Sequence, residues 1–134
     1  MPAGAESATI PAMPNTALIV AQPGPVREAL HSLAAAVPGL SPIWLAADLL
    51  QARTLAGRAP LRLVILGAGL SWASARALSA DLRSASARVG VIILTDQEPP
   101  GGLPPPIGAE VVLHGGTPAP RLIRVLQELL AATA

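Results

Sequence analysis

The fold class is decided by residues 61–95, which read LRLVILGAGLSWASARALSADLRSASARVGVIILT. Two apolar runs in this stretch, 61–66 and 88–95, are of the kind that forms strands buried on both faces of a parallel sheet. Residues 71–85 between them predict a helix. A strand, a helix and a strand in this order predict a βαβ unit, in which a crossover helix joins two parallel strands.

The same alternation continues on both sides of this unit. The further predicted strands are 16–21, 41–46 and 109–113, and the further predicted helices are 25–37, 49–57 and 118–132. Helix 49–57 is expected to begin after Asp48 as its N-cap and to stop at Gly57. Five strands alternating with helices predict a doubly wound, five-stranded parallel α/β sheet.

A proline-rich tract breaks the alternation at residues 96–108. It reads DQEPPGGLPPPIG and holds five prolines and three glycines where a further helix would be expected. Proline removes a helical hydrogen bond and clashes with the preceding turn, so the fourth helix of the fold is predicted to be degenerate. The tract fits an adaptable docking segment and an ordinary loop equally well, and Leu103 is its candidate contact to a partner.

Composition narrows the range of functions. With 134 residues, 51% of them apolar, the chain has enough material for the core of one domain. All nine basic residues are arginines, they form no run, and the net charge is +1, so direct nucleic-acid binding is not expected. The absence of cysteine excludes disulfides and thiolate metal sites and is compatible with a cytoplasmic protein.

The N-terminal residues 1–15 differ in character from the rest of the chain. They are rich in alanine and proline and lack the basic start and long apolar stretch of a signal peptide. We interpret them as a disordered leader in front of a domain at 16–134. No apolar run approaches the roughly 20 residues that a membrane-spanning helix needs, so we expect a soluble, cytoplasmic protein with no membrane contact.

Four segments together carry a family resemblance. They are ALIVAQPGPVREAL (17–30), LRLVILGAGL (61–70), ARVGVIILT (87–95) and GAEVVL (108–113). In order and spacing they resemble the receiver domain of two-component response regulators, particularly receivers that precede LuxR-type DNA-binding domains. The resemblance runs from about Thr16 to the end of the chain. It implies a flavodoxin-like sheet and a role in signal transduction or transcription control.

The resemblance also implies where a phosphorylation site would lie. A receiver transfers phosphate to an aspartate that follows its third strand, with Mg²⁺ held by this residue and an acidic pair, and with a lysine that meets the phosphoryl charge. In this sequence the acidic pair, the phosphoacceptor and the lysine fall on Ala21, Gln22, Gly67 and Gly115. His114 is the nearest polar neighbour of Gly115, Thr95 keeps the expected hydroxyl, and the aromatic switch residue falls on Val112.

Loss of these residues bears directly on activity. Phosphoryl transfer depends on positioned charge, and a chain without lysine cannot supply the receiver's cation. We therefore expect a non-catalytic pseudo-receiver with no cofactor and no metal, acting through a protein partner or as a homodimer. Trp72, Leu103 and Ile123 are the candidate contacts, because they are large apolar residues near the mouth of the sheet, in the proline-rich tract and on the last helix.

The glycine-rich turn after residue 66 suggests an alternative function. LVILGAGLSWASARAL is similar to the turn of dinucleotide-binding proteins, in which glycines approach a pyrophosphate at a helix N-terminus. Gly67 and Gly69 match the first two glycines, but Trp72 occupies the third position. The alternative is a small nucleotide- or dinucleotide-binding α/β domain that uses the loop from Gly67 to Ser71, where Ser71 is otherwise expected to cap the following helix.

Overall fold

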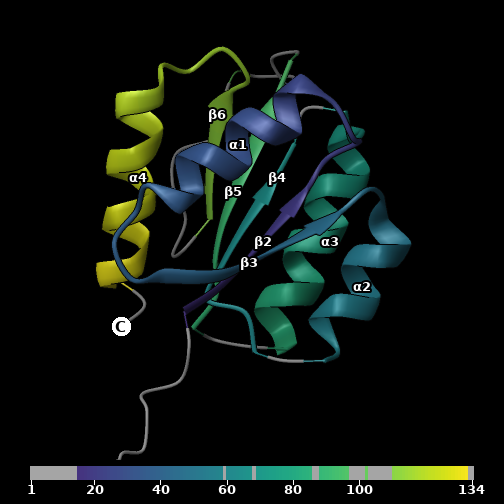
Figure 1. The fold of residues 1–134 in the computed structure, drawn as a ribbon. Helices are drawn as coiled ribbons and strands as arrows, with labels where there is room; N and C mark the ends of the chain where they lie inside the picture. The colour runs from purple at the N-terminus through teal and green to yellow at the C-terminus, as the bar shows by residue number, and fades with distance from the viewer. Residues whose placement is uncertain are drawn as a thin grey trace, which may run out of the picture.

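The chain folds into a five-stranded sheet with helices on both faces (Figure 1). The computed structural model describes residues 15–58, 60–67, 69–85, 88–96, 102 and 110–132. The strands are β2 (Asn15–Val20), β3 (Leu40–Ala46), β4 (Leu63–Leu66), β5 (Gly90–Thr95) and β6 (Glu110–His114). The helices are α1 (Pro25–Ala35), α2 (Leu49–Ala56), α3 (Trp72–Ala85) and α4 (Ala119–Ala132). Each of these elements was predicted, with boundaries within a few residues.

The sheet has the doubly wound topology that the sequence predicts. Its strand order is β3-β2-β4-β5-β6, and every neighbouring pair is parallel. The chain winds outward from β2 to β3 and then returns across β2 to β4, so the direction of winding reverses between β2 and β4. In flavodoxin-like folds, ligands bind at such a switch point, beyond the carboxyl ends of the strands.

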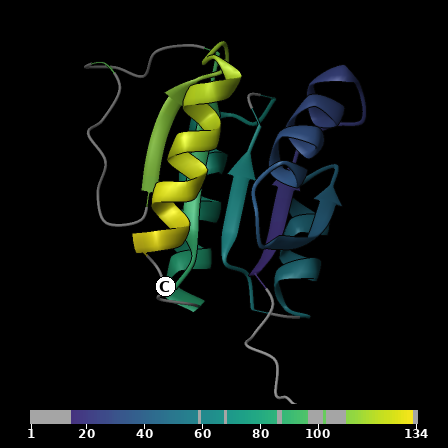
Figure 2. The same ribbon diagram turned by 60° about the vertical axis from the view of Figure 1, so that its left-hand side comes forward.

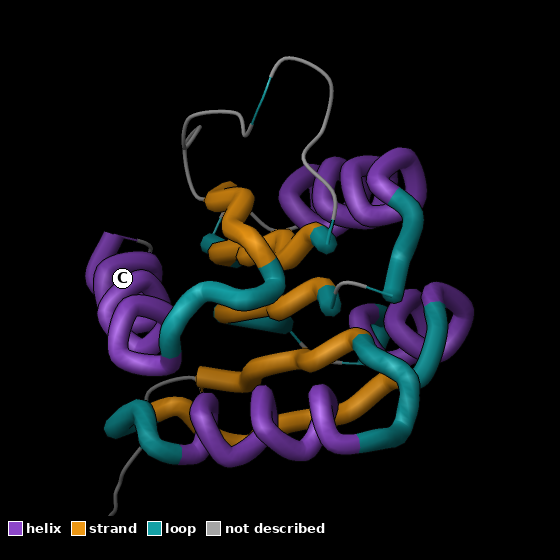
Figure 3. Tube along the Cα trace, turned by 90° about the horizontal axis from the view of Figure 1, so that it is seen from above, coloured by secondary structure: helices purple, strands orange, loops and turns teal. Residues whose placement is uncertain are grey.

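The core has two layers, one on each face of the sheet. Ala17 and Ile19 of β2 pack in the cluster that contains α1 and α4, whereas Leu18 and Val20 pack in the cluster that contains α2 and α3. Helix α4 contacts α1 and β4, and Figure 2 and Figure 3 show helices on both sides of the sheet. Burial on both faces explains why the strands are nearly continuous apolar runs.

Helix α2 begins as the sequence predicts. The side chain of Asp48 accepts a hydrogen bond of 2.9 Å from the backbone N–H of Gln51, and Gln51 Oε1 accepts one of 2.7 Å from the N–H of Ala47. The first bond satisfies a backbone donor that the first turn of the helix leaves open, and the second satisfies the N–H of the residue before the N-cap. Gly57 follows the last helical residue, as predicted, and its N–H donates to the carbonyl of Arg53.

Two predictions concern segments that are largely undescribed. Residues 1–14 of the predicted leader lie outside the described residues, and Asn15 is the first residue of β2. The predicted loss of the fourth helix concerns residues 96–108, of which 97–101 and 103–108, Leu103 included, lie outside the described residues. Within the described ranges, none of the helices is both long and apolar enough to cross a membrane.

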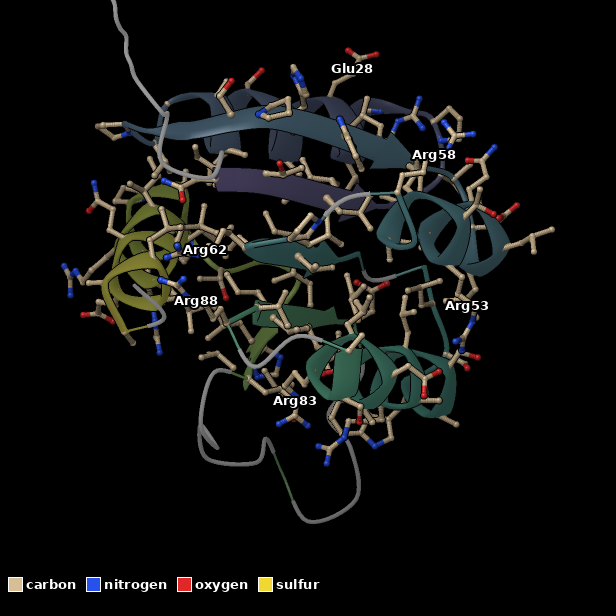
Figure 4. All side chains as sticks on the ribbon, turned by 90° about the horizontal axis from the view of Figure 1, so that it is seen from below. Glu28, Arg53, Arg58, Arg62, Arg83 and Arg88 are labelled. Atoms are coloured by element: carbon tan, nitrogen blue, oxygen red, sulfur yellow. The ribbon has the colours of Figure 1, made fainter. Side chains whose placement is uncertain are left out.

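The C-terminal part of α4 is held close to the sheet by one glycine and one arginine. A Cβ atom on Gly90 would lie 3.2 Å from Leu129 Cβ, so glycine permits the close approach of helix and strand. Arg62 Nη2 donates a hydrogen bond of 3.0 Å to the carbonyl of Leu130, and Figure 4 shows Arg62 beside this end of α4. A cation at the C-terminal end of a helix is favourable because the helix dipole is negative there.

Replacing Arg62 by glutamine is expected to lower the free energy of unfolding by about 1–2 kcal/mol, because it removes a charge-assisted hydrogen bond to a helix end. Urea denaturation followed by tryptophan fluorescence measures this change. Arg58→Gln is the matched control, since Arg58 is exposed just after α2. Equal effects of the two substitutions would contradict the role given to Arg62.

Candidate functional site

The candidate site lies at the carboxyl ends of the strands, which is the edge that Figure 3 views from above. Parallel strands bring their carboxyl ends to the same edge, so the residues that follow β2, β4, β5 and β6 come together there. The predicted receiver positions at this edge are Ala21, Gln22, Gly67, Thr95, His114 and Gly115. Hydrogen bonds join the neighbours directly, with Gly67 N–H to the Val20 carbonyl at 2.8 Å and Gly115 N–H to the Thr95 carbonyl at 2.9 Å.

Gly67, at the predicted phosphoacceptor position, is buried and tightly enclosed. A Cβ atom on this residue would lie 3.0 Å from the carbonyl oxygen of Val20 and 3.1 Å from Ala21 Cβ. The nearer contact is with backbone, which cannot rotate away as a flexible side chain can. Gly67 therefore leaves no room for an aspartate unless β2 and β4 shift.

The larger hollow at this edge is a cleft of about 550 Å³ on the side of the sheet covered by α1 and α4. Its inner wall is formed by four leucines, Leu30, Leu33, Leu94 and Leu122. Gln22, Asp96 and Thr117 supply the polar side chains of the lining. Of the predicted receiver positions, Ala21, Gln22 and Gly115 line this cleft. The cleft at the carboxyl ends of the strands is thus open and mainly apolar.

A smaller hollow of about 320 Å³ lies beside the glycine-rich turn. Gly67, Gly69 and Leu70 line it together with Asp48, the cap of α2. Neither hollow has an arginine or a histidine among its described lining residues, and each has a carboxylate, Asp96 or Asp48. A pyrophosphate would face like charge without a cationic side chain, so the geometry lends the dinucleotide hypothesis no electrostatic support, and it stays a prediction. Ser71 caps α3 as expected, accepting a hydrogen bond of 3.1 Å from the N–H of Ser74.

The two predicted partner contacts that the structure describes, Trp72 and Ile123, do not form one patch. Trp72 is partly buried against the α2 and α3 core, and the Arg76 guanidinium lies 5.3 Å from the centroid of its ring. Ile123 is partly buried against the α1 and α4 core, on the opposite face of the sheet. A partner that touches both residues would have to reach around the sheet.

Sequence reasoning missed a buried polar cluster around Glu110, the first residue of β6. This carboxylate is 4% exposed and accepts a hydrogen bond from the Ser79 hydroxyl of α3. Arg76 Nη1 lies 3.5 Å from Glu110 Oε1, and Arg83 Nη2 lies 3.6 Å from Glu110 Oε2. The spacing of Arg76, Ser79 and Arg83 places them on one side of α3, and this was the available signal. The cluster ties α3 to β6.

Asp96 is a further residue of the site that was not among the predicted site residues. It directly follows β5, and its exposed side chain lines the larger cleft. The available signal was its position, since residues that follow parallel strands gather at the same edge of the sheet.

Comparison with known proteins gives a structural match but no sequence match. No protein-family model and no curated protein matches the chain. A solved structure described as a two-component transcriptional regulator AraC from Clostridium phytofermentans ISDg is similar, with a TM-score of 0.71 and 14% sequence identity. The match covers 87% of this chain and 92% of that chain. The chain therefore has the flavodoxin-like α/β fold of a response-regulator receiver domain.

Proposed function

We propose that this chain is a pseudo-receiver, a regulatory module that works without phosphorylation through contacts with a protein partner or a second copy of itself. The observation that carries the proposal is the enclosed Gly67 at the place of the phosphoacceptor. Such a module would act in the cytoplasm, in signal transduction or transcription control, and would not be an enzyme.

The electrostatics of the edge support this proposal. A phosphoryl group on a receiver is stabilised by Mg²⁺ and by a lysine, whereas Ala21 and Gln22 offer no carboxylate for a metal. The whole sequence contains no lysine, and no arginine appears among the described residues that line the larger cleft. The hydroxyl of Thr95 cannot replace these charges, because a neutral group does not compensate a phosphate dianion.

The position of the aromatic switch supports a fixed state. Val112 occupies the position at which a receiver has its aromatic switch residue, and it is buried in the α2 and α3 core. A short β-branched side chain has few rotamers and cannot swing between a buried and an exposed position as a large ring can. We therefore propose that the module presents one constant surface to its partner.

A phosphorylation assay tests the proposal. The wild-type chain and Gly67→Asp are incubated with acetyl phosphate and Mg²⁺, and intact mass spectrometry detects any phosphoryl adduct. Neither protein is expected to gain one, because Gly67→Asp still lacks the acidic pair and the lysine. An authentic receiver treated in parallel provides the positive control. A phosphoryl adduct that hydroxylamine removes, as it removes an aspartyl phosphate, on a large fraction of either protein would overturn the proposal.

A further inference from the structure

We propose that the cleft between α1 and α4 binds a small molecule that has an apolar body and a positively charged group. This inference goes beyond the proposed regulatory function and does not depend on it, since a ligand could bind whether or not the chain regulates a partner.

The inner wall of the cleft suits an apolar body. Leu30 and Leu33 from α1, Leu94 from β5 and Leu122 from α4 converge on the same space. The volume of about 550 Å³ lies within the range of about 300–1,000 Å³ that is usual for small-molecule sites. The walls belong to helices and a central strand, so the site is formed before a ligand arrives.

The rim of the cleft leaves apolar surface in water. Val26, on the first turn of α1, lines the cleft and is 62% exposed. Within the described residues, large apolar side chains with this degree of exposure are rare, because most are buried in the two core layers. Val26 would be covered by a ligand that fills the cleft, so its position favours an occupant with an apolar surface.

The negative charge in the cleft favours a ligand with a positively charged group. Asp96 is the one ionisable side chain among the described residues of the lining. Its carboxylate makes no hydrogen bond or ion pair with any residue that the structure describes. Thr117, by contrast, donates its hydroxyl to the His114 carbonyl at 2.7 Å. Asp96 is therefore available to a cationic ligand.

The N-termini of α1 and α4 are poor sites for an anion in this cleft. The first turns of α1 and α4 both lie at the cleft, and free N–H groups of helix starts attract anions. Pro25 and Pro120, however, have no N–H, and the N–H of Arg121 already donates to the carbonyl of Pro118 at 3.0 Å. Few donors remain for an anion, while the full negative charge of Asp96 repels one.

A matched set of probes tests the proposal on the full chain. The probes are 2-phenylethylamine, 2-phenylethanol and 3-phenylpropionate, which carry positive, zero and negative charge on similar apolar bodies. Titration followed by ¹H–¹⁵N chemical shifts is expected to show saturable binding of the amine, with the largest shifts at Gln22, Val26 and Thr117. The amine should bind roughly two- to fivefold more tightly than the alcohol, the gain expected from one exposed ion pair, and the anion should bind least.

Three variants locate the site. Asp96→Asn is expected to abolish the preference for the amine over the alcohol while both still bind. Ala29→Trp, on an exposed lining position of α1, should fill the cleft and prevent binding of all three probes. Ala85→Trp, exposed at the end of α3 and away from the cleft, is the matched control and should leave binding unchanged.

Three outcomes would overturn the proposal: no saturable shift at the cleft of the folded wild-type protein, tighter binding of the propionate than of the amine, or an unchanged charge preference in Asp96→Asn. If Ala29→Trp fails to fold, Asp96→Asn alone still decides the case, because it changes the charge and not the volume of the site. Phosphorylation results leave this experiment unaffected, so the failure of one proposal is distinguishable from the failure of the other.

Discussion

Replacing Glu110 by alanine is expected to lower the free energy of unfolding by about 3 kcal/mol. The carboxylate is 4% exposed and is bonded to the fully buried Ser79. Its removal leaves the Ser79 hydroxyl without an acceptor and two arginines without their partner. The low end of the usual range applies because the side chains of Arg76 and Arg83 are 40% and 33% exposed and can turn towards water.

Urea denaturation followed by fluorescence of Trp44 and Trp72 measures the effect of Glu110→Ala. Glu128→Ala is the matched control, because Glu128 is exposed on α4, and it should change the stability by less than about 0.5 kcal/mol. A loss below about 1 kcal/mol for Glu110→Ala would mean that the buried carboxylate contributes little beyond its cost of desolvation.

Replacing Gly90 by valine is expected to lower the free energy of unfolding by about 2 kcal/mol. The new Cβ would lie 3.2 Å from Leu129 Cβ, and the methyl groups of valine would press further into α4. The preference of valine for strands offsets only part of this cost, because the whole strand-propensity scale spans about 1 kcal/mol. We expect the clash to outweigh this gain and the substitution to destabilise the protein, because Gly90 lies in the interior strand β5 and packs against Leu129 of α4.

A double-mutant cycle with Leu129→Ala tests the cause of the Gly90→Val effect. Alanine keeps the Leu129 Cβ but removes its two Cδ atoms, each of which would lie 3.6 Å from the new Cβ. If pressure of the valine methyl groups on these Cδ atoms is responsible, valine at position 90 should cost at least about 1 kcal/mol less when residue 129 is alanine. Strictly additive effects of the two substitutions would place the strain at the Cβ of residue 129, which alanine retains, or away from this side chain. Thermal or urea unfolding of the four proteins provides the measurement.

The sequence was sufficient for the elements and their order. Runs such as residues 61–66 are apolar at nearly every position, because a strand covered by helices on both faces has no side turned to water. The two ends of α2 could be predicted from Asp48 and Gly57, because a capping residue acts within one turn of the helix. The mouth of the sheet was predictable too, because parallel strands end at one edge.

The sequence was not sufficient for contacts between distant elements. The cleft depends on α1 and α4 lying on the same face, which brings Leu30 and Leu122 into one wall. Glu110 reads as one acidic residue at the start of a strand, and only the packing of α3 on β6 shows that it is buried beside Ser79. Enclosure of Gly67 likewise comes from the neighbouring β2, not from its own segment.

The all-parallel arrangement of strands also has a consequence for how the chain folds. Antiparallel neighbours can form a hairpin from adjacent residues, but each pairing here needs a crossover connection first. The pairing of β2 with β4 joins Ala17 to Leu63, so it closes a loop that contains α1, β3 and α2. Because loop closure must precede the gain from such contacts, folding is expected to be slow relative to helical domains of this size, with alignment of β2 and β4 as its late step.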